Sequence, residues 1–262
     1  MTVYRTARDE GDGFSDGIRQ VISAVIQSPF FLYRLEVGSP NPIEDSDNVV
    51  LLNSYEIAGR LSYLLWSSMP DDELFAAAAV DALQTADQIE AQARRMIVDP
   101  KARQAVTRFF IQWLEIEHIM DVIKDTEAYP EFDDELREAM LGETEAFIDD
   151  LVWGDDPTLN NLLTASHTFV NGRLANFYGI EAVSGPDFVR RDLPPLRARG
   201  ILGHGSLLAT HASPSLSSPV LRGMFVRSRI LCQEIPDPPP DLMVVPPDPE
   251  PGLTTRELYA EH

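Results

Sequence analysis

The chain has little cysteine and no long apolar run. One cysteine in 262 residues excludes an internal disulfide, and a single thiol is compatible with either redox environment. No segment approaches the roughly 20 apolar residues that a membrane-spanning helix needs, so we predict no transmembrane segment. The first residues, MTVYRTARDEGDG, are polar and mixed in charge, unlike a signal peptide.

Positive charge is also scarce. There are 21 Lys and Arg residues against 42 Asp and Glu residues, which gives a formal net charge of −21. An exterior of that sign repels phosphate backbones, so we expect no nucleic-acid partner. A length of 262 residues suits one large domain or two small ones, with a core that needs no disulfide or metal.

The familiar catalytic and metal-binding motifs are missing. Leu208 stands where a G-x-S-x-G elbow requires its last glycine, and glycine-rich phosphate loops and EF-hand loops are absent. Glu115 and His118 have the spacing of a di-iron ligand pair, but no second Glu-x-x-His accompanies them. His204 and His211 would lie about 10 Å apart along one helix, too far to share an ion. We therefore predict no catalytic residue and no metal ligand.

The sequence does have helical periodicity. Asn53 with Glu56, and Thr85 with Gln88, have the capping-box spacing that marks a helix start. A long acidic helix is expected over about residues 132–153. The apolar residues expected on one face of this helix are Leu136, Met140, Phe147, Ile148 and Leu151.

The acidic run in that long helix predicts a solvated face. Glu143 and Glu145 stand two residues apart, so on a helix they point in different directions. We therefore interpret them as part of a charged exterior and not as an acid/base pair. Residues 1–154 as a whole are predicted to form an acidic helical bundle.

After Gly154 the helices become shorter and the loops polar. We expect residues 155–233 to pack on the bundle as an irregular, Arg-rich part, with an extended piece at DFVRRDLP and a helix after Pro219. Its arginines are placed to attract the acids of 1–154. They are Arg173, Arg190, Arg191, Arg197, Arg199, Arg222, Arg227 and Arg229.

Residues 234–262 read as a Pro-rich tail, a stiff linker followed by the start of a next domain. A helix is expected to begin at Thr254 or Thr255, and the chain stops about two turns later. We therefore expect this chain to be an interior piece of a longer exported protein. The predicted fold class is all-α, a multi-helix bundle with an irregular Arg-rich C-terminal part and this tail.

Four stretches carry a family resemblance. They are SPFFLYRLE (28–36), YEIAGRLSYLLWSSMPDDEL (55–74), HTFVNGRLANFYGI (167–180) and RGILGHGSLLATHASPSLSSPVLRGMFV (199–226). In these stretches the chain resembles a large group of exported bacterial proteins, abundant in planctomycetes and myxobacteria. Those proteins consist of consecutive domains of unknown function with a c-type haem segment near the C-terminus.

The resemblance implies a haem c group in the full-length parent and a periplasmic or cell-surface location. The partner that it implies for this chain is the downstream haem segment of the same parent. Cys232 lies too early for that segment and lacks the Cys-x-x-Cys-His motif, so no cofactor is expected in these residues. The chain departs from the family at LSSPV, where TSPV is usual, and at His204, where an uncharged polar residue is common.

The third stretch, HTFVNGRLANFYGI, is interpreted as a structural connector between helices. Asn171-Gly172 is expected to reverse the chain into a short helix, whose Leu174, Phe177 and Tyr178 pack on the bundle. Its arginine, residue 173, is expected to pair with an acid of the long helix.

Three functional hypotheses stay open at this point. The first is a non-catalytic structural or binding module of a larger exported cytochrome-associated protein, supporting electron transfer or surface polymer metabolism. The alternative is a carboxylate-based hydrolase acting on polysaccharide, which requires two carboxyl groups at one cleft. The third is an interaction scaffold with no redox role, and whether the chain is an enzyme stays undecided. The candidate residues for a binding surface are His204, His211, Arg199 and Arg222.

Overall fold

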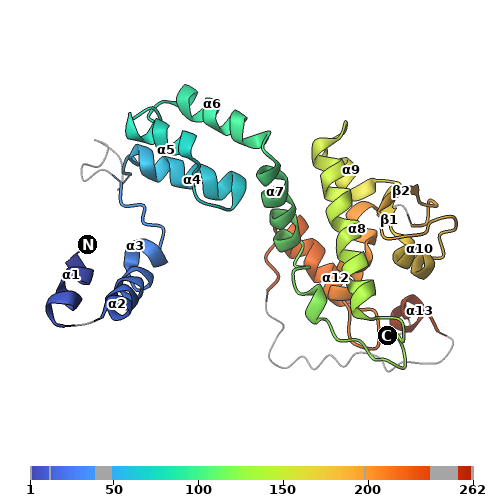
Figure 1. Cartoon of the computed structure of the whole chain (residues 1–262). Helices are drawn as coiled ribbons and strands as arrows, with labels where there is room; N and C mark the ends of the chain where they lie inside the picture. Colours follow the sequence, from blue (N-terminus) through green and yellow to red (C-terminus); the bar gives the residue numbers. More distant parts are fainter. Residues whose placement is uncertain (1, 12, 39–48, 198, 237–252, 261–262) are drawn as a thin grey trace. The chain divides into compact units, whose positions relative to one another are not determined.

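The computed structural model is mainly helical, which confirms the predicted all-α class (Figure 1). It describes residues 2–11, 13–38, 49–197, 199–236 and 253–260. By its internal contacts the chain divides into two compact units, Met1–Ala105 and Val106–His262. None of the helices in the described stretches is long and apolar enough to cross a membrane. Most of the predicted proline-rich linker, residues 237–252, lies outside the described part of the chain.

Helices make up the first unit. They are α1 (Thr2–Asp9), α2 (Phe14–Ile26), α3 (Pro29–Leu32), α4 (Ser54–Trp66), α5 (Asp72–Ala79) and α6 (Ala86–Ile97). The α4 helix packs on α5 and α6. Trp66 at the end of α4 is buried, and its indole N–H donates to the backbone oxygen of Met96 at 2.9 Å. This bond fixes the end of α4 to the end of α6.

Both predicted capping boxes are present. The Asn53 side chain accepts from the Glu56 N–H, and the Glu56 side chain accepts from the Asn53 N–H, which starts α4. Thr85 and Gln88 make the same pair of bonds at the start of α6. These predictions hold because a capping box involves only residues within one helical turn.

The α7 helix (Pro100–Trp113) crosses the division between the units. The second unit continues with η1 (Ile119–Asp121), α8 (Asp134–Trp153), α9 (Leu159–Thr164), β1 (His167–Val170), α10 (Gly172–Tyr178) and β2 (Val189–Asp192). It ends with η2 (Gly200–Gly203), α11 (Gly205–Thr210), α12 (Pro219–Phe225), the π-helical η3 (Val226–Ile230) and α13 (Thr255–Ala260).

The long α8 helix is the centre of the second unit. It begins at Asp133, whose side chain accepts from the Leu136 N–H at 2.8 Å. It packs against β1, α10 and α11 (Figure 1). All the residues predicted for its apolar face are buried, and they join two adjoining clusters. One cluster is built around Phe147, Ile148 and Leu151, and the other around Leu136 and Met140.

A small sheet lies beside α8. β1 and β2 pair antiparallel, with His167 opposite Asp192 and Val170 opposite Val189. The extended piece predicted at DFVRRDLP is β2, whereas β1 was not predicted. β1 is only four residues long, too short to show a clear alternation of apolar and polar residues.

Acids of residues 1–154 pair with several of the arginines that follow. Arg173 contacts Asp133 at 3.2 Å, as the predicted pairing with the long helix requires. Arg190 contacts Asp150 at 3.4 Å, and Arg229 forms an ion pair with Glu115. These side chains are partly exposed, so solvent screens each pair and its contribution to stability is small. The domain boundaries predicted at 154 and 233 stay predictions.

Candidate functional site

The most unusual residue of the second unit is a buried carboxyl group. Glu143 is 1% exposed, so its assignment to a solvated face was wrong, whereas Glu145 is exposed. Glu143 stands four residues from both Ala139 and Phe147 of α8, which are also buried. The acidic residues of α8 suggested a solvated face, but β1, α10 and α11 cover Glu143. The local charge pattern does not reveal this cover.

Three donors converge on Glu143. The Thr168 hydroxyl donates to Oε1 at 2.5 Å, and the Tyr178 hydroxyl donates to Oε2 at 2.7 Å. The Gly205 N–H approaches Oε2 at 3.3 Å and the Tyr178 oxygen at 2.8 Å. These donors come from β1, α10 and α11, so one carboxyl group links α8 to three of the elements packed on it.

Burial dominates the titration of this group. Loss of water raises the pKa of Glu143 to about 7, although the bonds from Thr168, Tyr178 and Gly205 favour the ionised form. Burial, together with the nearby Glu143 carboxylate, raises the pKa of Tyr178 well above its usual value. The Tyr178 phenol therefore stays protonated and remains a donor.

A second buried polar group lies one residue along α8. Thr144 Oγ1 is 3.0 Å from His204 Nδ1 and 2.7 Å from Ser206 Oγ. His204 is 2% exposed, and the edge of its ring meets Phe147, with ring centroids 4.8 Å apart. Burial first, and the charge of His167 second, lower the pKa of His204 to about 3, so its imidazole is neutral.

One atom of His204 has no bonding partner. Its Nε2 is buried and makes no hydrogen bond to any residue in the described part of the chain. Buried polar atoms almost always have a partner, and each exception calls for an explanation.

Gly205 allows the close approach of α11 to α8. A Cβ atom at this position would lie 2.6 Å from the Tyr178 hydroxyl and 2.9 Å from Met140 Cγ. Any larger residue would therefore push Tyr178 or α8 away from the Gly205 N–H.

A pocket of about 370 Å³ opens on this cluster. Glu143, Tyr178 and His204 lie in its wall, together with Arg197 and Arg199. Arg197 donates to the backbone oxygen of Tyr178 at 2.7 Å. The rest of the lining consists of Leu193, Leu196, Leu202, Gly203 and Leu208. The pocket thus combines an apolar wall, two cations and two buried titratable groups.

The structure brings together two of the four residues predicted for a binding surface. His204 and Arg199 line this pocket, although His204 is buried and not on a surface. His211 is part-buried, and its Nε2 lies 3.1 Å from the backbone oxygen of Leu114. Arg222 lies in α12, and neither it nor His211 lines the pocket. A binding role for the four residues stays a prediction.

Other singled-out residues lie apart from the pocket. Glu115 has a positive φ of 57° and pairs with Arg229, while His118 is exposed beside Glu117 at 3.4 Å. Cys232 is exposed. Within the described stretches, no group of three His, Cys, Asp or Glu side chains is placed to hold a metal ion.

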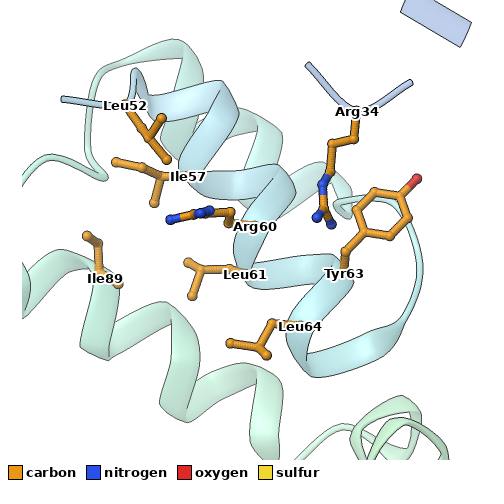
Figure 2. A pocket seen from close by; sticks show the side chains of 8 residues that line it. All are labelled: Arg34, Leu52, Ile57, Arg60, Leu61, Tyr63, Leu64 and Ile89. Atoms are coloured by element: carbon orange, nitrogen blue, oxygen red, sulfur yellow. The ribbon is translucent and has the colours of Figure 1, made fainter. Parts of the chain in front are cut away.

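The first unit has a larger pocket, of about 590 Å³. Figure 2 shows leucine and isoleucine side chains around it, with Arg34 beside the ring of Tyr63. Arg34 lies 5.0 Å from the centre of that ring, and Arg60 pairs with Glu36 at 2.8 Å. The two arginines of this pocket already have partners, and none of the described residues in its lining is an acid or a histidine, so this pocket is a weaker candidate for chemistry.

Sequence reasoning missed Glu143, Thr168 and Tyr178 as members of one site. Tyr178 was expected to pack on the bundle, but its hydroxyl partner lies 35 residues away. One feature of the sequence could have indicated that Glu143 is buried. It lies four residues from both Ala139 and Phe147, on the apolar face of α8.

Two family models match the chain. Residues 52–180 match PSD4, described as a protein of unknown function (DUF1592), and residues 198–262 match PSCyt3, a protein of unknown function (DUF1588). No curated protein and no solved structure matches the chain. Glu143, Thr168 and Tyr178 fall in the first matched range, and His204 and Gly205 fall in the second. The chain therefore carries two consecutive domains of unknown function, and the buried cluster joins them.

Proposed function

We propose that the chain is a non-catalytic structural and binding module of a larger exported protein associated with a c-type cytochrome. The parent would lie in the periplasm or at the cell surface. It would support electron transfer or the metabolism of surface polymers. Support comes from the two consecutive matched domains, one of which has a short name, PSCyt3, that carries the abbreviation for cytochrome. The family resemblance of the four sequence stretches points the same way.

The observation that carries the proposal is how the polar groups of the cluster are used. The Glu143 carboxyl accepts from Thr168, Tyr178 and Gly205, and these bonds tie the two matched ranges into one core. Buried networks of this kind hold packed elements in one arrangement. A rigid core of two joined domains suits a module that supports a neighbouring segment.

Haem is assigned to another segment of the parent. Covalent attachment of a c-type haem needs two cysteines followed by a histidine. This chain has one cysteine, Cys232, which is exposed and followed by Gln233. Its residues therefore do not fit covalent haem attachment.

The test is expression of the full-length gene in a host that matures c-type cytochromes in its periplasm. We expect haem absorbance in the exported full-length protein and none in the 262-residue chain expressed alongside it. A full-length protein without haem in that host, or one retained in the cytoplasm, would contradict the proposal. Absence of haem would favour the plain interaction scaffold.

One observation favours the alternative, a polysaccharide hydrolase. Glu143 lines a pocket and has a pKa of about 7, in the range that suits a general acid. Glycoside hydrolysis usually takes two carboxyl groups, and Glu143 is the one acid among the described residues that line this pocket. Release of reducing sugar from polysaccharides by the chain, abolished by Glu143→Gln, would favour the hydrolase over the module.

A further inference from the structure

We propose that the pocket of about 370 Å³ between α8, α10, residues 193–197 and 199, and α11 binds a small organic acid whose apolar body carries a hydroxyl group. The arginines would hold the carboxylate, the leucines would pack on the body, and His204 would bond the hydroxyl. Binding of such an acid does not depend on whether the parent protein carries haem.

The size and lining of the pocket indicate the body of the ligand. Its volume lies within the range of about 300–1,000 Å³ that is typical of small-molecule sites. Leu193, Leu202 and Leu208 are half-buried in its wall. Walls of this kind favour an apolar body such as an aromatic ring, because contact with them removes its surface from water.

The charge of the pocket indicates an anion. Arg197 and Arg199 are exposed side chains of its lining. One Arg197 nitrogen bonds the Tyr178 backbone oxygen, and a guanidinium has further N–H donors in a planar fork that matches a carboxylate. Glu143 is largely protonated below neutral pH because its pKa is about 7, and above that pH the two arginines outnumber it.

The unpartnered nitrogen of His204 indicates the hydroxyl. His204 lies in the pocket wall, and Thr144 holds the other ring nitrogen at 3.0 Å. Whichever tautomer is present, Nε2 is left as an unmet donor or an unmet acceptor. A hydroxyl group both donates and accepts, so it can bond either form.

The test is calorimetric titration of the whole chain with three matched probes. They are para-hydroxyphenylacetate, phenylacetate without the hydroxyl, and para-hydroxyphenylethanol without the charge. We expect the hydroxy acid to bind about tenfold more tightly than either analogue, which is the usual value of one well-placed hydrogen bond or charge contact.

Substitutions of the pocket residues test which side chains contact the ligand. Arg197→Ala and Arg199→Ala are expected to weaken binding of both acids about tenfold, and Arg227→Ala, which changes an exposed arginine outside the pocket, should leave binding unchanged. His204→Asn keeps a polar group near Thr144 but lacks Nε2, so it should bind the hydroxy acid no better than phenylacetate. The arginines are exposed or half-buried, so these variants should fold, and circular dichroism would verify each one.

Three results would overturn the proposal. The first is that the folded chain binds none of the probes. The second is that Arg227→Ala weakens binding as much as Arg197→Ala and Arg199→Ala do. The third is that wild-type protein binds the hydroxy acid and phenylacetate equally.

Discussion

Glu143 and His204 are buried titratable residues whose pKa values move in opposite directions. In the folded protein the pKa of Glu143 is about 7, whereas in the unfolded chain it is near 4.5. The folded protein therefore keeps this proton to a higher pH. The contribution of Glu143 to the free energy of unfolding therefore falls as the pH rises from 4.5 to 7. The unfolded chain protonates His204 below 6.5, but the folded protein does so only near 3. The contribution of His204 to the free energy of unfolding therefore falls as the pH drops from 6.5 to about 3.

The two effects oppose each other between pH 4.5 and 6.5, so the wild-type free energy of unfolding should be nearly flat there. In Glu143→Gln only the histidine of these two buried groups remains, and its contribution to the free energy of unfolding should rise with increasing pH by about 1 kcal/mol per pH unit. In His204→Asn the contribution of Glu143 should fall with a similar slope. Urea denaturation across this range measures all three. Parallel profiles for the wild type and both variants would contradict the assigned pKa shifts.

Gly205 and Tyr178 should be coupled. Gly205→Ala places a Cβ 2.6 Å from the Tyr178 hydroxyl, and we expect it to cost about 1–3 kcal/mol of stability. Tyr178→Phe removes that oxygen, so Gly205→Ala should cost less when it is combined with Tyr178→Phe. A double-mutant cycle of unfolding free energies measures the difference. Gly223→Ala is the control because no atom of the residues that the structure describes lies within 4 Å of its added Cβ, and it should not destabilise the protein. Additive costs would show that the two residues do not meet.

At the scale of elements, Glu56 does more than complete a capping box. Its Oε2 accepts from the Asn53 N–H, while Oε1 accepts from the N–H groups of Val37 at 2.8 Å and Gly38 at 3.0 Å. It thus attaches the segment before α4 to the first turn of that helix. Hydrogen bonds with Gly38 first, then Asn53, lower the pKa of Glu56.

Asn53→Ala should cost about 1 kcal/mol, the usual value of an N-cap, and Glu56→Ala should cost more. Hydrogen exchange distinguishes the two roles, because only Glu56→Ala should speed exchange at Val37 and Gly38. Gln88→Ala is the matched control, since Gln88 completes the box of α6 but, among the described residues, its side chain oxygen bonds only Gln84 and Thr85. Unchanged exchange at residues 37 and 38 in Glu56→Ala would contradict the attachment.

At the scale of the whole molecule, the chain contains two units, and each has buried apolar residues of its own. We expect two unfolding transitions in scanning calorimetry. Gly205→Ala should lower the temperature of one transition, and Asn53→Ala should lower that of the other. A single transition shifted by both variants would show that the units unfold together.

The two matched family ranges do not coincide with these units. The range 52–180 begins in the first unit, and its later part shares a core with the range 198–262. Leu162 and Ala165 of the first range pack in one cluster with Ile201 and Leu207 of the second. Separate expression of either range would therefore divide a single core.

Much of the candidate site was beyond prediction, although parts of it were recognisable. His204 and Arg199 stood out as candidates, and Tyr178 was expected to pack on the bundle. Glu143 was misassigned, because an acid that is covered by other elements and an acid in water have the same local sequence. Its donors lie 25 to 62 residues along the chain, where only packing brings them close.

The sequence by itself determined where helices begin and which face of α8 is apolar. Caps such as Asn53, Thr85 and Asn171 act within one turn, and helical spacing depends on the backbone alone. Only the tertiary structure decided the burial of Glu143, the pairing of β1 with β2 and the unpartnered nitrogen of His204. Each of these depends on which distant segments exclude water from a residue, and that is a property of the packed chain and not of its local pattern.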